Sequence, residues 1–173
     1  MKNNIVTVLN EYHGDKDNKR KDSHLKGFYS LVREQLEDDS LELKKGAPIK
    51  EFSYRSKRWD FSIWREDELK AVIELKSLHK SAAKNFNNRI EEAVGCATFL
   101  KRAYPNVKTG YLCIGDSLCD KLSARLIGFA NDCKQHGWYD GVCCILIDKN
   151  RNFSMPPGLS IDEMVKNLQQ GIV

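Results

Sequence analysis

The chain has 173 residues, of which 41% are hydrophobic and 30% are charged, and a formal net charge of +4. This composition excludes a fibrous or largely disordered chain, and the length suffices for one domain with a buried core. No apolar run approaches the roughly 20 residues that span a bilayer, and the first residues lack the features of a secretory signal. We therefore expect one cytoplasmic domain over residues 1–173. The modest positive charge permits a negatively charged partner without requiring one.

The N-terminal part of the chain predicts an arm followed by a helix. Residues 1–22 combine a short apolar stretch with a dense charge run, which predicts an arm that ends in a charged connector. Apolar residues then recur at helical spacing, which predicts an amphipathic helix over residues 23–37. The apolar stripe consists of Leu25, Phe28, Tyr29, Val32 and Leu36. Glu34 falls on the opposite side of this helix, which makes it a poor candidate for a metal ligand.

A predicted β-hairpin over residues 58–77 follows a first predicted strand over residues 49–54. Two apolar arms flank the tripeptide Glu66-Asp67-Glu68, which predicts a three-residue loop centred on Asp67. Asp60 and Glu74 each lie seven residues from Asp67, so this register places them opposite each other. Opposed residues in an antiparallel pair have Cβ atoms about 5 Å apart, and like charges there repel.

Lys76 joins the two carboxylates on one face of the predicted hairpin, because strand side chains alternate between the two faces. The opposite face is apolar and is expected to enter a core; it consists of Phe61, Ile63, Ile73 and Leu75. Paired carboxylates suit a hard cation such as Mg²⁺, which also binds a phosphate oxygen and acidifies a bound water. A lysine can orient that water or offset developing charge. The cluster therefore predicts phosphodiester hydrolysis, and Glu74→Ala is expected to abolish it while leaving the fold intact, since the site is taken to be on the surface.

Basic residues lie next to this acidic cluster in the sequence. Arg55, Lys57 and Arg58 are interleaved with aromatic residues, and Lys80 lies in a polar, basic loop over residues 77–88. Such residues suit phosphate contacts along a DNA groove. A charged strand edge that is kept soluble by lysine and arginine is an equally valid interpretation of the pattern, and the proximity of the acids favours the phosphate contacts.

The C-terminal half predicts alternating helices and strands. A helix is expected over residues 86–104, ending before Pro105, with Arg89 and Glu92 at ion-pair spacing. Further elements are expected as a strand over residues 107–114, a helix capped by Asp116 or Ser117 that ends at Gly137, and a strand over residues 141–147. In the tail over residues 151–173, Ser160 and Glu163 predict a capping box that opens a short terminal helix. This order predicts an α/β fold with a mixed central sheet flanked by helices.

The six cysteines show no C-x-x-C spacing and no histidines at zinc-ligand intervals. Reduced cysteine behaves as a small hydrophobic residue, and most of these cysteines have apolar neighbours. They therefore predict core packing and not a zinc site.

Two motifs resemble a known family of nucleases. Asp60 followed by Glu74-Leu75-Lys76 resembles the D…(D/E)-x-K signature of the PD-(D/E)xK nuclease superfamily, with Trp59 where the superfamily name has proline. The segment over residues 85–95, NFNNRIEEAVG, is similar to a stretch of the XhoI-type restriction endonucleases, in which it also follows an E-L-K-S. The later Trp138-Tyr139-Asp140 is similar as well, so the resemblance extends over residues 50–148.

The resemblance implies a type II restriction endonuclease with a PD-(D/E)xK core, which cuts a short palindrome in double-stranded DNA as a Mg²⁺-dependent homodimer. Carried over by motif, Asp60, Glu74 and the backbone carbonyl of Leu75 would bind the metal, and Lys76 would assist the attacking water. Glu92 would lie just behind these residues. DNA contacts are expected from Arg55, Lys57, Arg58, Lys80, Asn88 and Arg89.

Three alternatives stay open at the level of sequence. A repair or recombination nuclease of the same fold, such as a junction-resolving enzyme, would need branched DNA. A non-catalytic DNA-binding module would keep the fold, although all three predicted catalytic residues are present. An α/β domain in which Asp60 and Glu74 are merely exposed strand acids is the third, and the hairpin register and the 85–95 motif argue against it.

Overall fold

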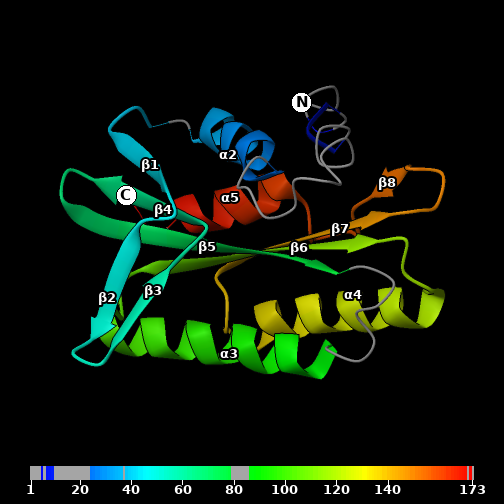
Figure 1. The fold of residues 1–173 in the computed structure, drawn as a ribbon. Helices are drawn as coiled ribbons and strands as arrows, with labels where there is room; N and C mark the ends of the chain where they lie inside the picture. Colours follow the sequence, from blue (N-terminus) through cyan, green and yellow to red (C-terminus); the bar gives the residue numbers. More distant parts are fainter. Residues whose placement is uncertain are drawn as a thin grey trace.

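A computed structural model of the chain describes residues 5, 7–9, 24–36, 38–78, 86–170 and 172. Its main feature is a six-stranded sheet in the order β1-β4-β5-β6-β7-β8, with helices on both faces (Figure 1). The strands are β1 (Leu41–Lys45), β2 (Pro48–Phe52), β3 (Arg55–Arg58), β4 (Phe61–Arg65), β5 (Glu68–Leu78), β6 (Lys108–Asp116), β7 (Gly141–Ile147) and β8 (Phe153–Ser154). The helices are α2 (His24–Gln35), α3 (Phe86–Ala103), α4 (Asp120–Gln135) and α5 (Ile161–Gln169). The predicted α/β fold with a mixed sheet between helices is confirmed.

The sheet is parallel at its centre and antiparallel at both edges. Strand β6 pairs in parallel with β5 and β7, whereas β1, β4 and β8 pair antiparallel. Helices connect the parallel strands, as such crossovers require. The predicted strand over residues 141–147 is β7, and its nearly continuous burial agrees with a strand that is covered on both faces.

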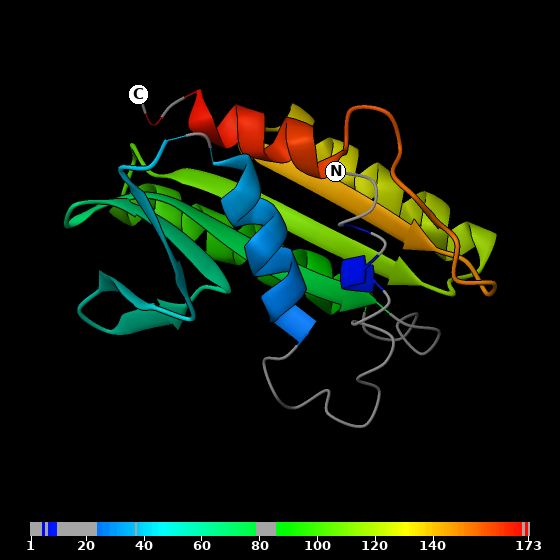
Figure 2. The same cartoon turned by 90° about the horizontal axis from the view of Figure 1, so that it is seen from above.

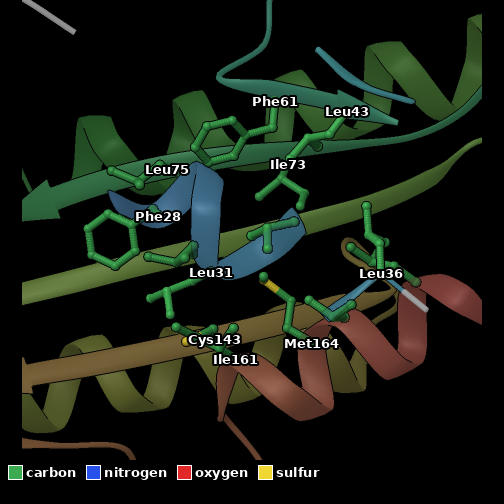
Figure 3. Close-up of a cluster of buried hydrophobic side chains, with 14 of the residues drawn as sticks. Phe28, Leu31, Leu36, Leu43, Phe61, Ile73, Leu75, Cys143, Ile161 and Met164 are labelled. Atoms are coloured by element: carbon green, nitrogen blue, oxygen red, sulfur yellow. The ribbon is translucent and has the colours of Figure 1, made fainter. Parts of the chain in front are cut away.

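Two helices cover each face of the sheet. Helices α2 and α5 lie on one face, and α3 and α4 lie on the other (Figures 1 and 2). The core under α2 and α5 includes Phe61 and Ile73 from the hairpin, which meet Phe28 of α2 and Met164 of α5 (Figure 3). Gly141 lets α5 approach β7 closely, because a Cβ atom there would lie 2.5 Å from the Met164 carbonyl oxygen.

Strands β4 and β5 form the predicted hairpin, but with a tighter turn than expected. Arg65 pairs with Glu68, so only Glu66 and Asp67 form the turn, and the prediction of a three-residue loop was wrong. Glu66 has a φ of 54°, and positive φ values are typical of two-residue hairpin turns. A bulge between Ile63 and Trp64 then shifts the pairing by one residue. Beyond the bulge the register is the predicted one.

The residues between α2 and the hairpin are the part of the fold that the sequence predicted least well. Strand β1 was not predicted, although it pairs with β4 at the edge of the main sheet. The predicted strand over residues 49–54 is β2, which pairs with β3 in a separate two-stranded sheet. This β2–β3 hairpin extends from the sheet edge towards α3 (Figure 1). It is anchored there by Ile49 and the fully buried Trp59, which pack with Leu100 of α3.

The helix ends agree with the sequence except at α4. Helix α3 ends before Pro105, and Ser160 and Glu163 form the predicted capping box at α5. The N-cap of α4 is Cys119, so the prediction of Asp116 or Ser117 was wrong. Strand β6 extends to Asp116, and Ser117 adopts a φ of 53°, which a helix cap does not have. Gly137 ends this region with a φ of 65°.

Three expectations stay predictions: the single domain, the N-terminal arm over residues 1–22 and the extent of the tail. Most of the arm lies outside the described residues. Of the predicted loop over residues 77–88, residues 79–85 are likewise not described.

None of the described helices is long and apolar enough to cross a membrane. All six cysteines lie in the described part of the chain as free thiols, and five of them are buried, as expected for core residues.

Candidate active site

The hairpin brings Asp60 and Glu74 together. Asp60 lies in the connection between β3 and β4, one residue before the pair formed by Phe61 and Ile73. Its Oδ2 atom accepts a hydrogen bond of 2.7 Å from the backbone N–H of Leu75. The Asp60 carboxylate is thereby held beside the strand that carries Glu74, as the register predicted.

Glu74 is buried, with only 2% of its surface exposed, and two ammonium groups hold its carboxylate. The Nζ atom of Lys76 lies 2.5 Å from Glu74 Oε1. The Nζ atom of Lys57 donates to Oε1 at 3.2 Å and lies 3.0 Å from Oε2. Oε2 nevertheless accepts no hydrogen bond from the described residues. The expectation of a surface carboxylate was therefore wrong, and it was the reason for expecting Glu74→Ala to leave the fold intact.

Lys76 connects Glu74 to helix α3. Its Nζ atom also donates to Glu92 Oε1 at 3.1 Å, and Arg89 donates to the other oxygen of Glu92 at 2.7 Å. Burial lowers the pKa of Lys76, but the carboxylates of Glu74 and Glu92 more than offset this, so that the pKa lies above its usual value. Burial raises the pKa of Glu92, and Arg89 and Lys76 more than offset this, so its pKa is lowered. At neutral pH Lys76 is therefore an ammonium between two carboxylates.

The pKa of Asp60 shifts in the opposite direction to that of Glu92. Burial raises its pKa most strongly, the hydrogen bond from Leu75 lowers it, and the negative charge of Glu74 raises it again. The resulting pKa lies above the usual value of an aspartate. The predicted repulsion between the two facing carboxylates is thus present, and a cation between them would relieve it.

Aromatic side chains pack beneath the charged residues. Strand pairing places Tyr111 of β6 beside Glu74, and the rings of Tyr111 and Tyr139 lie 5.0 Å apart. The hydroxyl group of Tyr139 donates to the carbonyl of Ala93 in α3 at 2.9 Å. Both tyrosines are almost completely buried, and burial raises their pKa values well above normal. They shield this side of Glu74 from water, which strengthens its electrostatic interactions.

The residues predicted to contact DNA lie in different environments. Arg55 is bound to the buried Glu51, and its guanidinium lies 4.3 Å from the centre of the Phe99 ring. Arg58 is exposed and donates to the carbonyl of Gly46 at 3.2 Å. Lys57 points into the acidic site. Asn88 and Arg89 are exposed at the start of α3. Lys80 lies outside the described residues.

Two features of the site were not recognised in the sequence. Lys57 was expected to face a phosphate, and its ion pair with Glu74 joins β3 to β5, two strands that belong to different sheets. The buried ion pair between Glu51 and Arg55 was not predicted at all. Period-two alternation along β3 is the signal that was available, since Arg55 and Lys57 share the partly buried face of that strand.

The oxygen atoms of the site fit a hard cation. The ligands would be the carboxylates of Asp60 and Glu74, and the buried Oε2 of Glu74 accepts no hydrogen bond from the described residues, although Lys57 Nζ lies 3.0 Å from it. Among the described residues, no group of three or more His, Cys, Asp or Glu side chains is arranged to hold a metal. A cation held by two carboxylates would keep several waters, which is the usual coordination of Mg²⁺ in phosphate-processing sites.

The chain matches the family model of "Restriction endonuclease XhoI" over residues 10–111, which is more than half of its length. The matched range includes the β2–β3 hairpin, the β4–β5 hairpin and helix α3, and with them Lys57, Asp60, Glu74, Lys76 and Glu92. Neither the curated proteins nor the solved structures yield a match. The chain belongs to the XhoI restriction endonuclease family, and it is an endonuclease that hydrolyses DNA.

Proposed function

We propose that this endonuclease cuts duplex DNA at a short palindromic site, that it depends on Mg²⁺ and acts as a homodimer, and that Asp60, Glu74 and Lys76 form its active site. The observation that carries the proposal is the convergence of these three side chains at one end of the β4–β5 hairpin. Asp60 is fixed by Leu75 N–H, and Glu74 lies in contact with Lys76.

In this mechanism Asp60 and Glu74 hold the cation, together with the backbone carbonyl of Leu75. The bound cation would acidify a water molecule and neutralise charge on the phosphate. Lys76 acts as a cationic hydrogen-bond donor, because its raised pKa keeps it protonated at neutral pH. It orients the attacking water or stabilises the negative charge of the transition state. Glu92 and Arg89 position Lys76 from helix α3.

Exposed basic residues around the site would contact the DNA backbone. Arg58 is exposed on β3, and Asn88 and Arg89 are exposed at the start of α3. These two elements lie on the same side of the sheet (Figure 1). Lys80 belongs to the same proposal because it follows the active-site strand in the sequence. Phosphate contacts of this kind fix the position of a protein on DNA, while base contacts determine the recognition sequence.

The homodimer follows from the palindromic site in this proposal. A two-fold symmetric protein matches a two-fold symmetric DNA site, and two active sites then cut both strands. Light scattering after size-exclusion chromatography, with and without duplex DNA, measures the mass of the complex. A monomer on cleaved palindromic DNA would contradict this part of the proposal.

The function is tested by digesting a long, sequenced duplex with the purified protein and Mg²⁺. We expect discrete fragments whose ends map to one short palindrome, and no fragments with Glu74→Gln, which keeps the shape of the side chain. Cleavage of four-way junctions without cleavage of linear duplex would instead favour a junction-resolving enzyme of the same fold.

A further inference from the structure

Lys57 occupies an unusual place for a lysine on an edge hairpin. Only 16% of its side chain is exposed, and its Nζ atom lies 5.0 Å from the centre of the Trp59 ring. Within the described residues, its ion pair goes to Glu74 alone. The lysine is thus directed into the active site by the alternation of β3, whose Ser56 and Arg58 point outwards.

The two lysines on Glu74 differ in their other partners. Lys76 has a second carboxylate, Glu92, and comes from β5, an interior strand of the main sheet. Lys57 comes from the two-stranded β2–β3 sheet, which is not part of the main sheet. Lys57 can therefore leave Glu74 without breaking any pairing of the strands that carry Glu74 and Lys76.

A divalent cation and Lys57 compete for the same carboxylate. The Nζ atom of Lys57 lies within 3.2 Å of both oxygens of Glu74. A cation bound to either oxygen would lie next to this ammonium group, and like charges at such distances repel strongly in a partly buried site. A cation at Glu74 would therefore have to displace Lys57.

A DNA phosphate is the partner that can draw Lys57 away. Arg58 follows Lys57 directly and is exposed on the outward face of β3, so that a phosphate bound there would bring negative charge to the same hairpin. Lysine is a compact, mobile charge on a flexible stem, which suits a transfer between two anions. Movement of Lys57 to the phosphate would free Glu74 for the cation.

We propose that Lys57 is a resident counterion of the metal site, which blocks the cation in the free enzyme and moves to a DNA phosphate in the complex. This inference rests on the proposed metal site of Asp60 and Glu74. DNA and cation then bind cooperatively, and the coupling is reciprocal, so that each raises the affinity for the other. Lys57 is a positioning residue in this account, because it acts through Glu74.

The test is a calorimetric titration of the full chain with Ca²⁺ in the absence of DNA. We expect Lys57→Met to bind Ca²⁺ roughly tenfold more tightly than the wild type, because one neighbouring positive charge is removed. The matched control is Lys44→Met. Lys44 also lies 5.0 Å from a tryptophan ring centre, that of Trp64, and 3.0 Å from a glutamate oxygen, that of Glu42, but outside the site. Its variant is expected to bind Ca²⁺ as the wild type does.

Equal or weaker Ca²⁺ binding by Lys57→Met would overturn the proposal, because it would show that the charge of Lys57 does not oppose the cation. Thermal unfolding shows whether the variant folds, and Lys57→Gln replaces it if it does not. A second measurement needs no variant: Ca²⁺ should raise the affinity of the wild-type protein for a mixed-sequence duplex, as measured by fluorescence anisotropy. This increase should be smaller in the Lys57 variant, and an increase of equal size would also overturn the proposal.

Glu74→Gln separates this proposal from the proposed function. If Glu74→Gln binds Ca²⁺ as well as the wild type does, the metal site itself is wrongly assigned. If Glu74→Gln loses Ca²⁺ binding while Lys57→Met leaves it unchanged, only the role of Lys57 fails.

Discussion

Two clusters in this protein each hold a carboxylate between two lysine ammonium groups, but the pKa of the aspartate is lowered in one cluster and raised in the other. Asp140, which precedes β7, lies between the ammonium groups of Lys101 and Lys108 at 3.2 and 3.5 Å. Its Oδ2 atom also accepts hydrogen bonds from the backbone N–H and the hydroxyl of Thr109 at 2.8 and 2.9 Å. Burial raises the pKa of Asp140, but these donors and Lys101 more than offset this and lower it.

The proposed active-site cluster also has two ammonium groups, which lie on Glu74, but they do not offset the effect of burial on Asp60. The pKa of Asp60 is raised, mainly by burial, and the buried Oε2 of Glu74 accepts no hydrogen bond from the described residues. A carboxylate whose ionised form is fully hydrogen-bonded stabilises the fold. A buried carboxylate and a half-buried one that repel each other are instead suited to an additional ligand. We therefore assign Asp140 to stability and propose that Asp60 and Glu74 serve catalysis.

The largest expected effect is that of Glu74→Gln on cleavage. The substitution removes the charge that would hold the cation, and we expect the single-turnover rate to fall by about 10³-fold or more, the scale of a lost electrostatic stabiliser. Cleavage of a labelled duplex under enzyme excess measures this rate. A rate close to that of the wild type would show that the two clusters do not differ in function.

Lys76→Met is expected to reduce the same rate by about 10²-fold, because an ammonium group near the transition state is lost. Ca²⁺ binding should persist, since Asp60 and Glu74 remain. Titration calorimetry beside the cleavage assay separates the two effects. Loss of Ca²⁺ binding together with cleavage would assign Lys76 to the metal site and not to the chemical step.

Asp140→Asn should affect stability and not cleavage. Because the pKa of Asp140 is lowered in the folded state, its ionised form stabilises the protein at pH values above the unfolded pKa. This contribution is lost as the pH falls through the folded pKa. We expect the variant to lose about 1–3 kcal/mol of unfolding free energy at neutral pH, and the difference from the wild type to shrink in acid. Urea denaturation across this pH range measures it, and a difference that grows in acid would contradict the assignment.

Arg58→Ala should have the smallest effect. Its exposed guanidinium is proposed to contact one DNA phosphate, so its loss should reduce the slope of log affinity against log salt by about one. Anisotropy titrations with Ca²⁺ at several salt concentrations measure the slope. Lys44→Ala is the control, and an equal change in both variants would argue against a specific contact by Arg58.

The sequence predicted that Asp60 and Glu74 lie close together because two independent constraints act on them. Apolar residues on one face of the hairpin fix which side Glu74 and Lys76 occupy, and the register beyond the bulge places Asp60 next to them. The turn was predicted wrongly, since one residue fewer in the loop is compensated by one extra residue in the bulge. Such compensation leaves no mark in the apolar pattern.

The β2–β3 hairpin was harder to predict because its contacts are distant in sequence. Whether Lys57 faces a phosphate or Glu74 depends on how this hairpin packs against α3, and alternation within four residues does not decide that. Strand β1 is short and charged, LELKK, so its pairing with β4 and not its composition makes it a strand. The N-cap at Cys119 likewise follows from the length of β6.

The most direct test of the account is anomalous diffraction from crystals of the protein with duplex DNA and Mn²⁺ in place of Mg²⁺. We predict a peak between the carboxylates of Asp60 and Glu74, with the ammonium of Lys57 withdrawn from Glu74 towards a phosphate. Bound DNA without an anomalous peak at this pair, or with a peak at another cluster, would contradict the central claim that these two carboxylates form the metal centre.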